Sequence, residues 1–220
     1  MLIQTLIPQI STLAPQDYQE IKRPQYENVI SMFLKKAKPT SHPTIYHMFG
    51  IPSAGKSTFY NTHNWTQHVL VSFDAIMENL PEYQTDILKL GPVASFQKWE
   101  IPARIIGYEL LRRAVQEHKN IFFDHGGSTP AHLDLLKNLY TLGYNTEIYY
   151  IRCDLENALK RAEKREKQTL RHTPPQMIIQ RNKMINQLVN EYKKAADAFY
   201  TYDSTSNGFV FNQALSSSLK

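Results

Sequence analysis

The stretch 50–58, with the sequence Gly-Ile-Pro-Ser-Ala-Gly-Lys-Ser-Thr, carries the clearest chemical signal in the chain. Its glycines, lysine and serine have the spacing of a phosphate-binding loop, in which backbone N–H groups turn inward around an anion. A flexible loop that matches by chance is the alternative, but a strand-like run at 44–49 precedes it and a helix-compatible run follows. We therefore expect a nucleoside triphosphate to bind at Gly50, Ile51, Pro52, Ser53, Ala54, Gly55, Lys56, Ser57 and Thr58.

Two side chains of this loop and two later carboxylates have the chemistry to act on phosphates. Lys56 would reach the β- and γ-phosphates as a catalytic cation, and the Ser57 hydroxyl would bind Mg²⁺. Asp74 and Asp124 each follow an apolar, β-prone run, and ligands of open α/β sheets lie at the carboxyl ends of the strands. Asp124 is therefore a candidate ligand of Mg²⁺ and of substrate. Asp74 is a candidate catalytic base and substrate contact, and the plainer alternative is a helix N-cap.

Three candidate arginines lie in the middle of the basic segment 152–183. This segment contains nine Lys and Arg against four Asp and Glu and so accounts for the whole net charge of +5. Arg161 and Arg165 are four residues apart and would share one helix face, while Arg171 lies in a short loop before two prolines. Such a segment could close over a γ-phosphate and neutralise the charge of the transferring group, which makes all three arginines catalytic candidates. Contact with adenine or phosphate fits equally, and a solvated basic helix is the plain alternative.

Two further side chains are candidate substrate contacts. His125 begins the tight loop His-Gly-Gly-Ser after the strand-like run 121–124, although a turn histidine without function is equally well supported. Arg104 lies on an expected helix at 101–118.

Composition restricts the class of protein. With 220 residues and 42% hydrophobic side chains, the chain is long enough to bury a sizeable core. It has no apolar run of membrane-spanning length, and Met1 to Pro15 lacks the features of a signal peptide. The single Cys153 excludes an internal disulfide and a multi-cysteine metal site, so we expect a reducing, cytoplasmic compartment. The basic stretch suits nucleic acid, anionic lipid or a polyphosphate.

The elements that must position these residues alternate between strands and helices. Apolar β-prone runs and helical periodicities follow one another, which is typical of a parallel sheet with right-handed crossovers. Residues 79–100 lack a clear period and contain Pro81, Gly91 and Pro92, so we expect a substrate-covering loop with short helices. The other expected helices are 15–38, 56–62, 101–118, 130–142, 155–167 and 177–200, and the expected strands are 44–49, 69–73, 121–124, 146–151 and one near the end of the chain.

The predicted fold class is α/β, a P-loop NTPase fold of the kinase-like, three-layer kind with a central, mostly parallel sheet. We expect an N-terminal helical extension and connector at 1–43, a P-loop kinase domain at 44–215 with a lid near 166–175, and a frayed tail at 216–220.

These features together resemble the zeta toxin family of P-loop small-molecule kinases, over about residues 18–202. The resemblance implies transfer of the ATP γ-phosphate to a hydroxyl, which in zeta toxins belongs to a UDP-activated amino sugar. It also implies that Asp74 is the general base, that Asp124 holds substrate, and that Arg161 or Arg165, with Arg171, steadies the transferring phosphate. One departure concerns the loop after the third strand. The family usually has a Gly-Thr-Gly-Arg-like sequence there, and this chain has Asp-His-Gly-Gly-Ser at 124–128.

The leading hypothesis is thus a kinase that uses ATP and Mg²⁺ and phosphorylates a small or nucleotide-linked hydroxyl acceptor. A polynucleotide 5′-hydroxyl kinase is the second hypothesis, with nucleic acid as partner, and a nucleotide-dependent binding module without an acceptor is the third. The resemblance also raises a neutralising, antitoxin-like protein as a partner.

Overall fold

The computed structural model describes residues 2–15, 23–169 and 171–218. A seven-stranded sheet forms its centre, with the strand order β2-β3-β1-β4-β5-β6 and with β7 also paired to β5. The strands β2 to β5 in this order are parallel, and β6 and β7 run antiparallel along the outer edge of β5. The strands are β1 (Thr44–Phe49), β2 (Val69–Ser72), β3 (Ile121–Asp124), β4 (Asn145–Arg152), β5 (Ala198–Thr205), β6 (Gly208–Phe211) and β7 (Ser217–Ser218).

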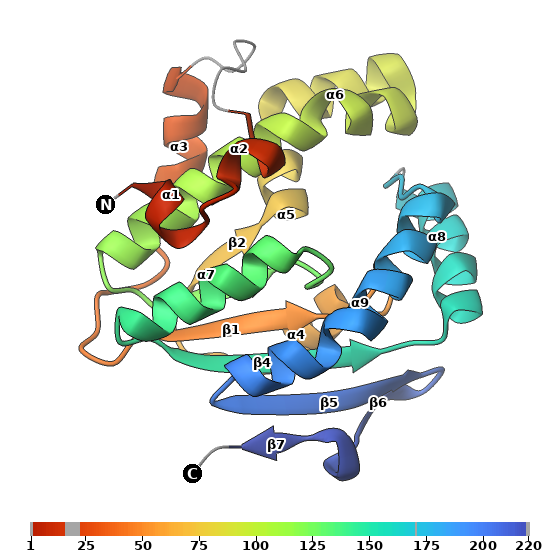
Figure 1. Cartoon of the computed structure of the whole chain (residues 1–220). Helices are drawn as coiled ribbons and strands as arrows, with labels where there is room; N and C mark the ends of the chain where they lie inside the picture. Colours follow the sequence, from red (N-terminus) through yellow and green to blue (C-terminus); the bar gives the residue numbers. More distant parts are fainter. Residues whose placement is uncertain (1, 16–22, 170, 219–220) are drawn as a thin grey trace.

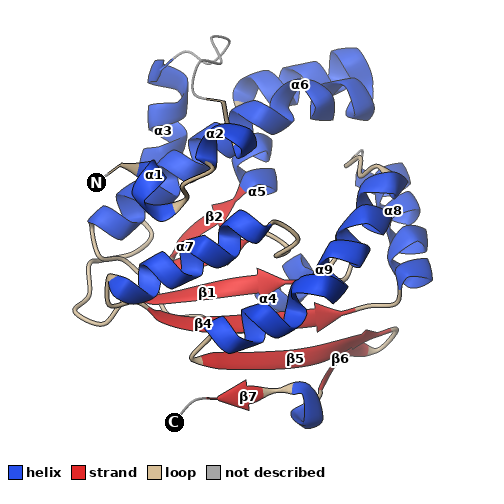
Figure 2. Ribbon diagram, in the orientation of Figure 1, coloured by secondary structure: helices blue, strands red, loops and turns tan. Residues whose placement is uncertain are grey.

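Helices cover both faces of the sheet (Figures 1 and 2). In these views α7 (Pro130–Thr141) and α9 (Pro175–Ala195) cross in front of the strands, and α4 (Lys56–Thr62) lies behind them. The inner strand β3, between β2 and β1, has helices over both faces, and its buried residues Ile121-Phe122-Phe123 are all apolar. This arrangement confirms the predicted α/β fold with a mostly parallel sheet.

Three other helices pack against β2 at one edge of the sheet: α3 (Arg23–Leu34), α5 (Phe73–Glu78) and α6 (Pro81–Gln116). A further helix, α8 (Leu155–Thr169), follows the end of β4. Two short helices, α1 (Ile3–Leu6) and α2 (Ile10–Leu13), bury Leu6, Ile7 and Ile10 against this body. The helix expected at 15–38 is described from Arg23, since 16–22 lie outside the described residues.

The expectation of a substrate-covering loop at 79–100 was wrong, because α6 runs through this whole region. Its only break in helical backbone is Gly91, whose φ of 79° and ψ of 172° lie outside the helical range. Pro81 stands in the first turn of α6, and Pro92 follows the break directly. Proline is well tolerated at the first position of a helix, where its missing N–H costs no hydrogen bond. These prolines therefore start helical segments instead of excluding them.

The C-terminal boundaries also differ from the sequence-based expectation. The helix expected at 177–200 ends at Ala195, because Asp197 binds β4: its backbone N–H donates to the Thr146 carbonyl (2.9 Å) and its carboxylate accepts from the Thr146 N–H (2.7 Å). The tail expected to fray is paired with β5 at Ser217–Ser218, and residues 219–220 lie outside the described residues. The division into domains stays a prediction.

No helix in the described part of the chain is long and apolar enough to cross a membrane.

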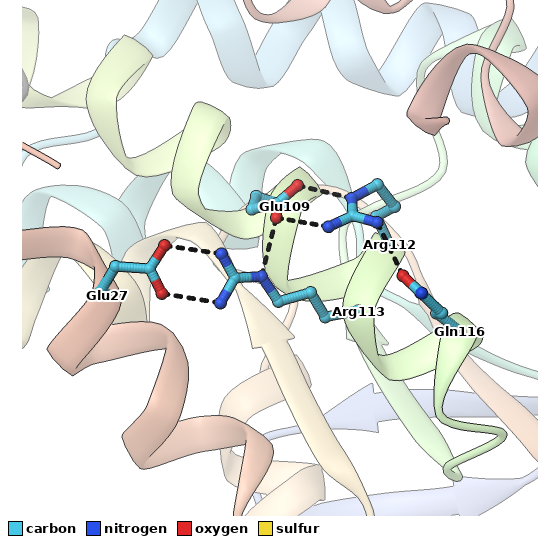
Figure 3. Close-up of polar contacts among 5 residues, drawn as sticks. All are labelled: Glu27, Glu109, Arg112, Arg113 and Gln116. Atoms are coloured by element: carbon cyan, nitrogen blue, oxygen red, sulfur yellow. Dashed lines mark hydrogen bonds and ion pairs between the residues drawn. The ribbon is translucent and has the colours of Figure 1, made fainter. Parts of the chain in front are cut away.

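A network of ion pairs joins α3 to α6 (Figure 3). The Arg113 guanidinium donates to both carboxylate oxygens of Glu27, at 2.7 Å each, and to Glu109. Arg112 donates to the same Glu109 carboxylate and to Gln116. Paired N–H groups of arginine match the two oxygens of a carboxylate, so the link between Arg113 and Glu27 has a fixed geometry. It connects the N-terminal part of the chain to the helix that carries Arg104.

We predict that Arg113→Ala lowers the free energy of unfolding by about 1 kcal/mol, because it removes charged hydrogen bonds between two helices. Lys194→Ala is the control. Lys194 is exposed and pairs with Glu191 of its own helix, α9, so its loss should cost about 0.5 kcal/mol or less. Urea denaturation of both variants tests this, and equal losses would show that the link to Glu27 adds nothing.

Candidate active site

The phosphate loop follows β1 and lies between the loop after β3 and the end of β4. The Gly50 N–H donates to the Gly126 carbonyl at 3.0 Å. A Cβ atom on Gly50 would approach the Ile151 carbonyl oxygen to 2.5 Å, and the φ of 142° disfavours other residues as well. Gly50 is therefore required here because the backbone of β4 leaves no room for a side chain.

The loop leads into α4, which begins after Gly55. Gly55 has a φ of 101°, and no side chain caps the first turn of α4. The N–H groups of this turn consequently have no side-chain acceptor and are available to an anion. Pro52, Ser53 and Gly55 to Thr58 line a cavity of about 580 Å³, whereas Gly50, Ile51 and Ala54 support the loop from outside this lining.

Lys56 folds back across the loop. Its ammonium donates to the carbonyls of Gly50 (3.1 Å) and Ile51 (2.9 Å). Burial lowers the pKa of Lys56 to about 8, and the charge of Asp124 opposes this shift. The ammonium is thus held against the loop backbone, where its charge is available to an anion.

All the ionisable residues singled out from the sequence reach this one cavity. Lys56, Asp74, Arg104, Asp124, His125, Arg161, Arg165 and Arg171 all line it. The lining has six Lys and Arg side chains against three carboxylates, Asp74, Glu100 and Asp124. This excess of positive charge suits a polyphosphate.

Asp74 lies in the first turn of α5 but does not cap it. The Ser72 hydroxyl accepts from the Ala75 N–H (3.4 Å) and so takes the N-cap role that the sequence left open for Asp74. The Asp74 carboxylate instead accepts a hydrogen bond from the Arg171 guanidinium. Burial works to raise the pKa of Asp74, but Arg171 and, behind it, Arg165 outweigh it and hold this pKa below its usual value.

Asp124 lies at the end of β3, the strand next to β1, and its charge acts on the loop lysine. The Ser72 hydroxyl donates to its carboxylate (3.3 Å). Burial raises the pKa of Asp124, although the Lys56 charge acts in the opposite direction. Among the described residues there is no group of three or more His, Cys, Asp or Glu that could hold a metal. Mg²⁺ is often bound by one or two protein side chains, with water and substrate phosphates as its other ligands. Ser57 and Asp124 fit a site of this kind.

His125 is a neutral, packed residue at the cavity wall. Its ring stacks on Phe123 (5.8 Å between centroids) and meets the His132 ring edge-on at 4.1 Å. Burial holds the pKa of His125 well below its usual value, with His132 adding to the shift. The imidazole can therefore offer a hydrogen bond to a ligand, but it adds no positive charge.

The arginines of the basic segment have different partners. Arg161 donates to the Ser204 hydroxyl (2.8 Å), to the Thr205 carbonyl (3.1 Å) and to the Ala54 carbonyl (3.4 Å), so it joins the β5–β6 hairpin to the phosphate loop. Arg165 donates to the Thr173 hydroxyl at 2.5 Å. Arg165 and Arg171 thus reach the cavity from α8 and from the loop after it.

Three other basic residues of this segment form ion pairs on the surface. Lys160 pairs with Glu156 and Lys167 with Glu163, all four well exposed, and Arg152 pairs with Asp203. The local excess of positive charge is therefore concentrated at the cavity, where Arg161, Arg165 and Arg171 lie, more than on a surface for nucleic acid.

Arg181 is a cavity residue that the sequence analysis did not single out. It comes from α9, and no hydrogen bond or ion pair joins it to another residue in the described part of the chain. Burial lowers the pKa of Arg181, and the nearby Arg104 charge adds to this effect. Arg104 itself is ion-paired with Glu100. The sequence does hold one indication of this role: Arg181 lies between the buried positions Ile178 and Ile185, so a charged side chain stands on the packed side of the helix.

The β5–β6 hairpin was also missed as part of the site. Ser204, Thr205, Ser206, Gly208 and Phe209 line the cavity beside the loop, and Phe209 lies where a Cβ atom on Gly55 would meet it at 3.2 Å. The sequence shows a short terminal strand here, but nothing in it indicates that the strand lies next to the phosphate loop.

The parallel sheet, the loop after β1 and the charged cavity at its carboxyl edge define a P-loop protein of the kinase-like class. A sequence model of the family described as "Zeta toxin" matches residues 30–213. The chain therefore belongs to the zeta toxin family, as the sequence resemblance suggested.

Solved structures agree with this fold. The chain is similar to a protein of the PezAT chromosomal toxin-antitoxin system of Streptococcus pneumoniae, with 15% identity, a TM-score of 0.63, and coverage of 84% of this chain and 78% of that one. It is also similar to a chain solved in an AvrRxo1-ORF1:AvrRxo1-ORF2 complex with sulphate ions, with 14% identity, a TM-score of 0.58, and coverage of 86% and 66%. A related AvrRxo1-ORF1:-ORF2 structure with ATP has 13% identity, a TM-score of 0.52, and coverage of 86% and 65%. A comparison with curated proteins found no match.

We predict that Lys56→Met unfolds at a higher temperature than the wild type at pH 7 without nucleotide. The folded pKa of Lys56 is about 8, and an unfolded lysine has a value near 10.4. The folded state therefore binds fewer protons between about pH 8 and 10, and its stability rises with pH in that window. The variant lacks this rise. Its unfolding temperature should exceed that of the wild type by about 2–4 °C at pH 7, which corresponds to about 1 kcal/mol in a chain of this size. This difference should shrink toward pH 10.

Thermal unfolding at pH 7, 8, 9 and 10 measures this difference. Lys160→Met, at an exposed lysine, is the control and should show no such trend. A Lys56→Met variant less stable than the wild type at pH 7 would contradict the prediction.

Proposed function

We propose that this protein is a kinase that transfers the γ-phosphate of ATP, with Mg²⁺, to a hydroxyl of a small or nucleotide-linked acceptor. The observation that carries the proposal is the gathering of Lys56, Asp74 and Asp124 around one cavity with arginines from α8 and the loop after it. A protein that only binds a nucleotide needs the loop, its lysine and an acid for Mg²⁺, but it has no use for a second carboxylate, Asp74, beside Arg171.

The nucleotide and its metal would be held by residues of the loop and of β3. Backbone N–H groups of the loop and Lys56 would bind the phosphates, and Ser57 with Asp124 would hold Mg²⁺. Bound Mg²⁺ neutralises charge that develops on the β- and γ-phosphates. The structural neighbour solved with ATP supports this choice of nucleotide.

Asp74 would accept the proton of the acceptor hydroxyl as that oxygen bonds to the γ-phosphorus and the bond to the β-phosphate oxygen breaks. Arg171 and Arg165 would stabilise the negative charge on the transferring group. Positioning and charge stabilisation supply most of the catalysis of phosphoryl transfer, so the cavity needs no covalent nucleophile.

The acceptor side of the cavity favours an anionic molecule. Arg181 has no anionic partner among the described residues, and Arg104 shares its side of the wall with a neutral His125. Phe73 and Phe96 add apolar surface there. Arginine side chains bind phosphate strongly, and an aromatic surface suits a ring, so a nucleotide-linked sugar such as a UDP-amino sugar fits this side.

We further infer a cytoplasmic protein that a second protein neutralises. The family membership supports this inference, as does the similarity to a member of a toxin-antitoxin system and to a chain solved in a two-protein complex.

Replacing the base tests the reaction directly. We expect Asp74→Asn to lower turnover by about 10²- to 10⁴-fold, because an amide cannot accept the hydroxyl proton. The dissociation constant of ATP should stay within about threefold, or decrease, since the change removes a negative charge. The measurement is transfer of label from γ-labelled ATP to products of a fractionated cell extract, with calorimetry for ATP binding. Native turnover in the variant would remove Asp74 from the mechanism.

Arg181 provides a second test, aimed at the acceptor. Once the labelled product is identified, Arg181→Gln should raise the KM for the acceptor about tenfold, the effect of losing one charged hydrogen bond, and leave the affinity for ATP unchanged. Arg181→Lys keeps the charge and should lose less. If acceptor KM is the same in all three proteins, the anion lies elsewhere.

A further inference from the structure

Arg171 contacts two carboxylates of the same short helix. One end of its guanidinium donates to Asp74, and the other end lies 3.7 Å from Glu78. The two acids are four residues apart on α5, which places them on one face of the helix. Arginine has a planar, forked head whose two ends can bind different partners at once. Glu78 is therefore positioned to hold this guanidinium when Asp74 does not.

The contact with Asp74 conflicts with the role proposed for that residue. A general base must lie within hydrogen-bonding reach of the hydroxyl whose proton it takes. In this structure an oxygen of the Asp74 carboxylate is occupied by Arg171, and the ion pair stabilises the deprotonated, weakly basic form. Turnover consequently requires Arg171 to leave Asp74 while remaining close enough to act on the γ-phosphate.

We propose that Glu78 is a positioning residue for the phosphoryl transfer proposed above: it retains one end of Arg171 and so allows the other end to leave Asp74 for the nucleotide phosphate. This inference rests on the proposed function. Asp74 and Arg171 line the cavity, and all three side chains are partly open to solvent, since Asp74 and Glu78 are 48% and 47% exposed and Arg171 is 23% exposed. Exchange of partners therefore needs rotation of side chains and no opening of the core.

The loop that carries Arg171 is fixed at its next two residues. His172 hydrogen-bonds to Glu166 of α8 at 2.9 Å, and Thr173 accepts from Arg165. The backbone of Arg171 is thus anchored beside α8, and its side chain can change partner without movement of the whole segment. Because its backbone is anchored, Arg171 stays within reach of the second carboxylate, Glu78, when it leaves Asp74.

The experiment follows the pKa of the Asp74 carboxyl by carbon-13 NMR, with and without Mg²⁺ and the non-hydrolysable β,γ-imido analogue of ATP. The charged and titratable groups that face Asp74 are Arg171 of the loop, Arg165 of α8, Arg181 of α9, Glu78 of α5, Asp124 of β3, Tyr83 of α6 and Lys56 of the phosphate loop. The analogue adds negative charge, which raises this pKa directly. Arg171→Gln measures that direct effect alone, because it has no guanidinium to release.

In the wild type, we expect the analogue to raise the pKa of Asp74 by about one unit more than in Arg171→Gln, since an adjacent arginine lowers a carboxyl pKa by about 1–3 units. In Glu78→Gln the additional rise should be lost, because Arg171 stays on Asp74. Glu78→Ala, which also removes the amide, should behave in the same way. Glu191→Gln, at an exposed ion pair with Lys194, should match the wild type.

An equal rise in Glu78→Gln and the wild type, or no additional rise in the wild type, would overturn the inference while leaving the kinase proposal intact. Calorimetry on the same samples separates the two ideas: if the analogue does not bind to the wild type, the proposed function fails and takes this inference with it. Circular dichroism melting curves identify any variant that does not fold, and Arg171→Met, which also lacks a cation, then replaces Arg171→Gln.

Discussion

The close approach of Gly50 to the backbone of β4 is the constraint on which the site depends. With the Ile151 carbonyl on one side and a hydrogen bond to Gly126 on the other, the chain leaving β1 has one route open to it. That route brings the loop across the carboxyl edge of the sheet and leads directly into α4. The acids after β2 and β3 face the loop because they end strands of the same parallel sheet.

The cavity has a marked imbalance of charge. Six cationic side chains converge on three carboxylates, so each cation lies closer to like charges than it would in solution. Short contacts to carbonyls and acids hold Lys56, Arg161 and Arg171, while Arg181 is left without such a partner among the described residues. Such a site is less stable when empty than when an anion fills it, which is the usual relation between a binding site and its ligand. Binding of an anion relieves the repulsion among these cations, and this relief contributes to the affinity for phosphates.

The sequence was sufficient for those features whose physical cause is local. Gly50, Gly55 and Lys56 identify the loop because backbone geometry and one side chain determine it, and apolar runs such as Ile121-Phe122-Phe123 identify the buried strands. The course of α6 was misjudged because Pro81 and Pro92 stop a helix or start one depending on their position, which local sequence does not reveal. Arg181 and Phe209 escaped notice since their place in the site results from packing between distant segments. For the same reason the sequence did not reveal that Arg161 binds Ser204 of the hairpin.

The contacts of Arg161 with Ser204 and Thr205 determine when the site can exist during synthesis and folding. One wall of the cavity comes from the β5–β6 hairpin, far along the chain from the phosphate loop that it adjoins. Contacts between distant segments form late, because closing a long loop costs entropy before the contact can stabilise it. A chain that is still emerging from the ribosome has its phosphate loop long before it has this wall. This wall of the cavity is therefore completed only when β5 and β6 have been made and have joined the sheet.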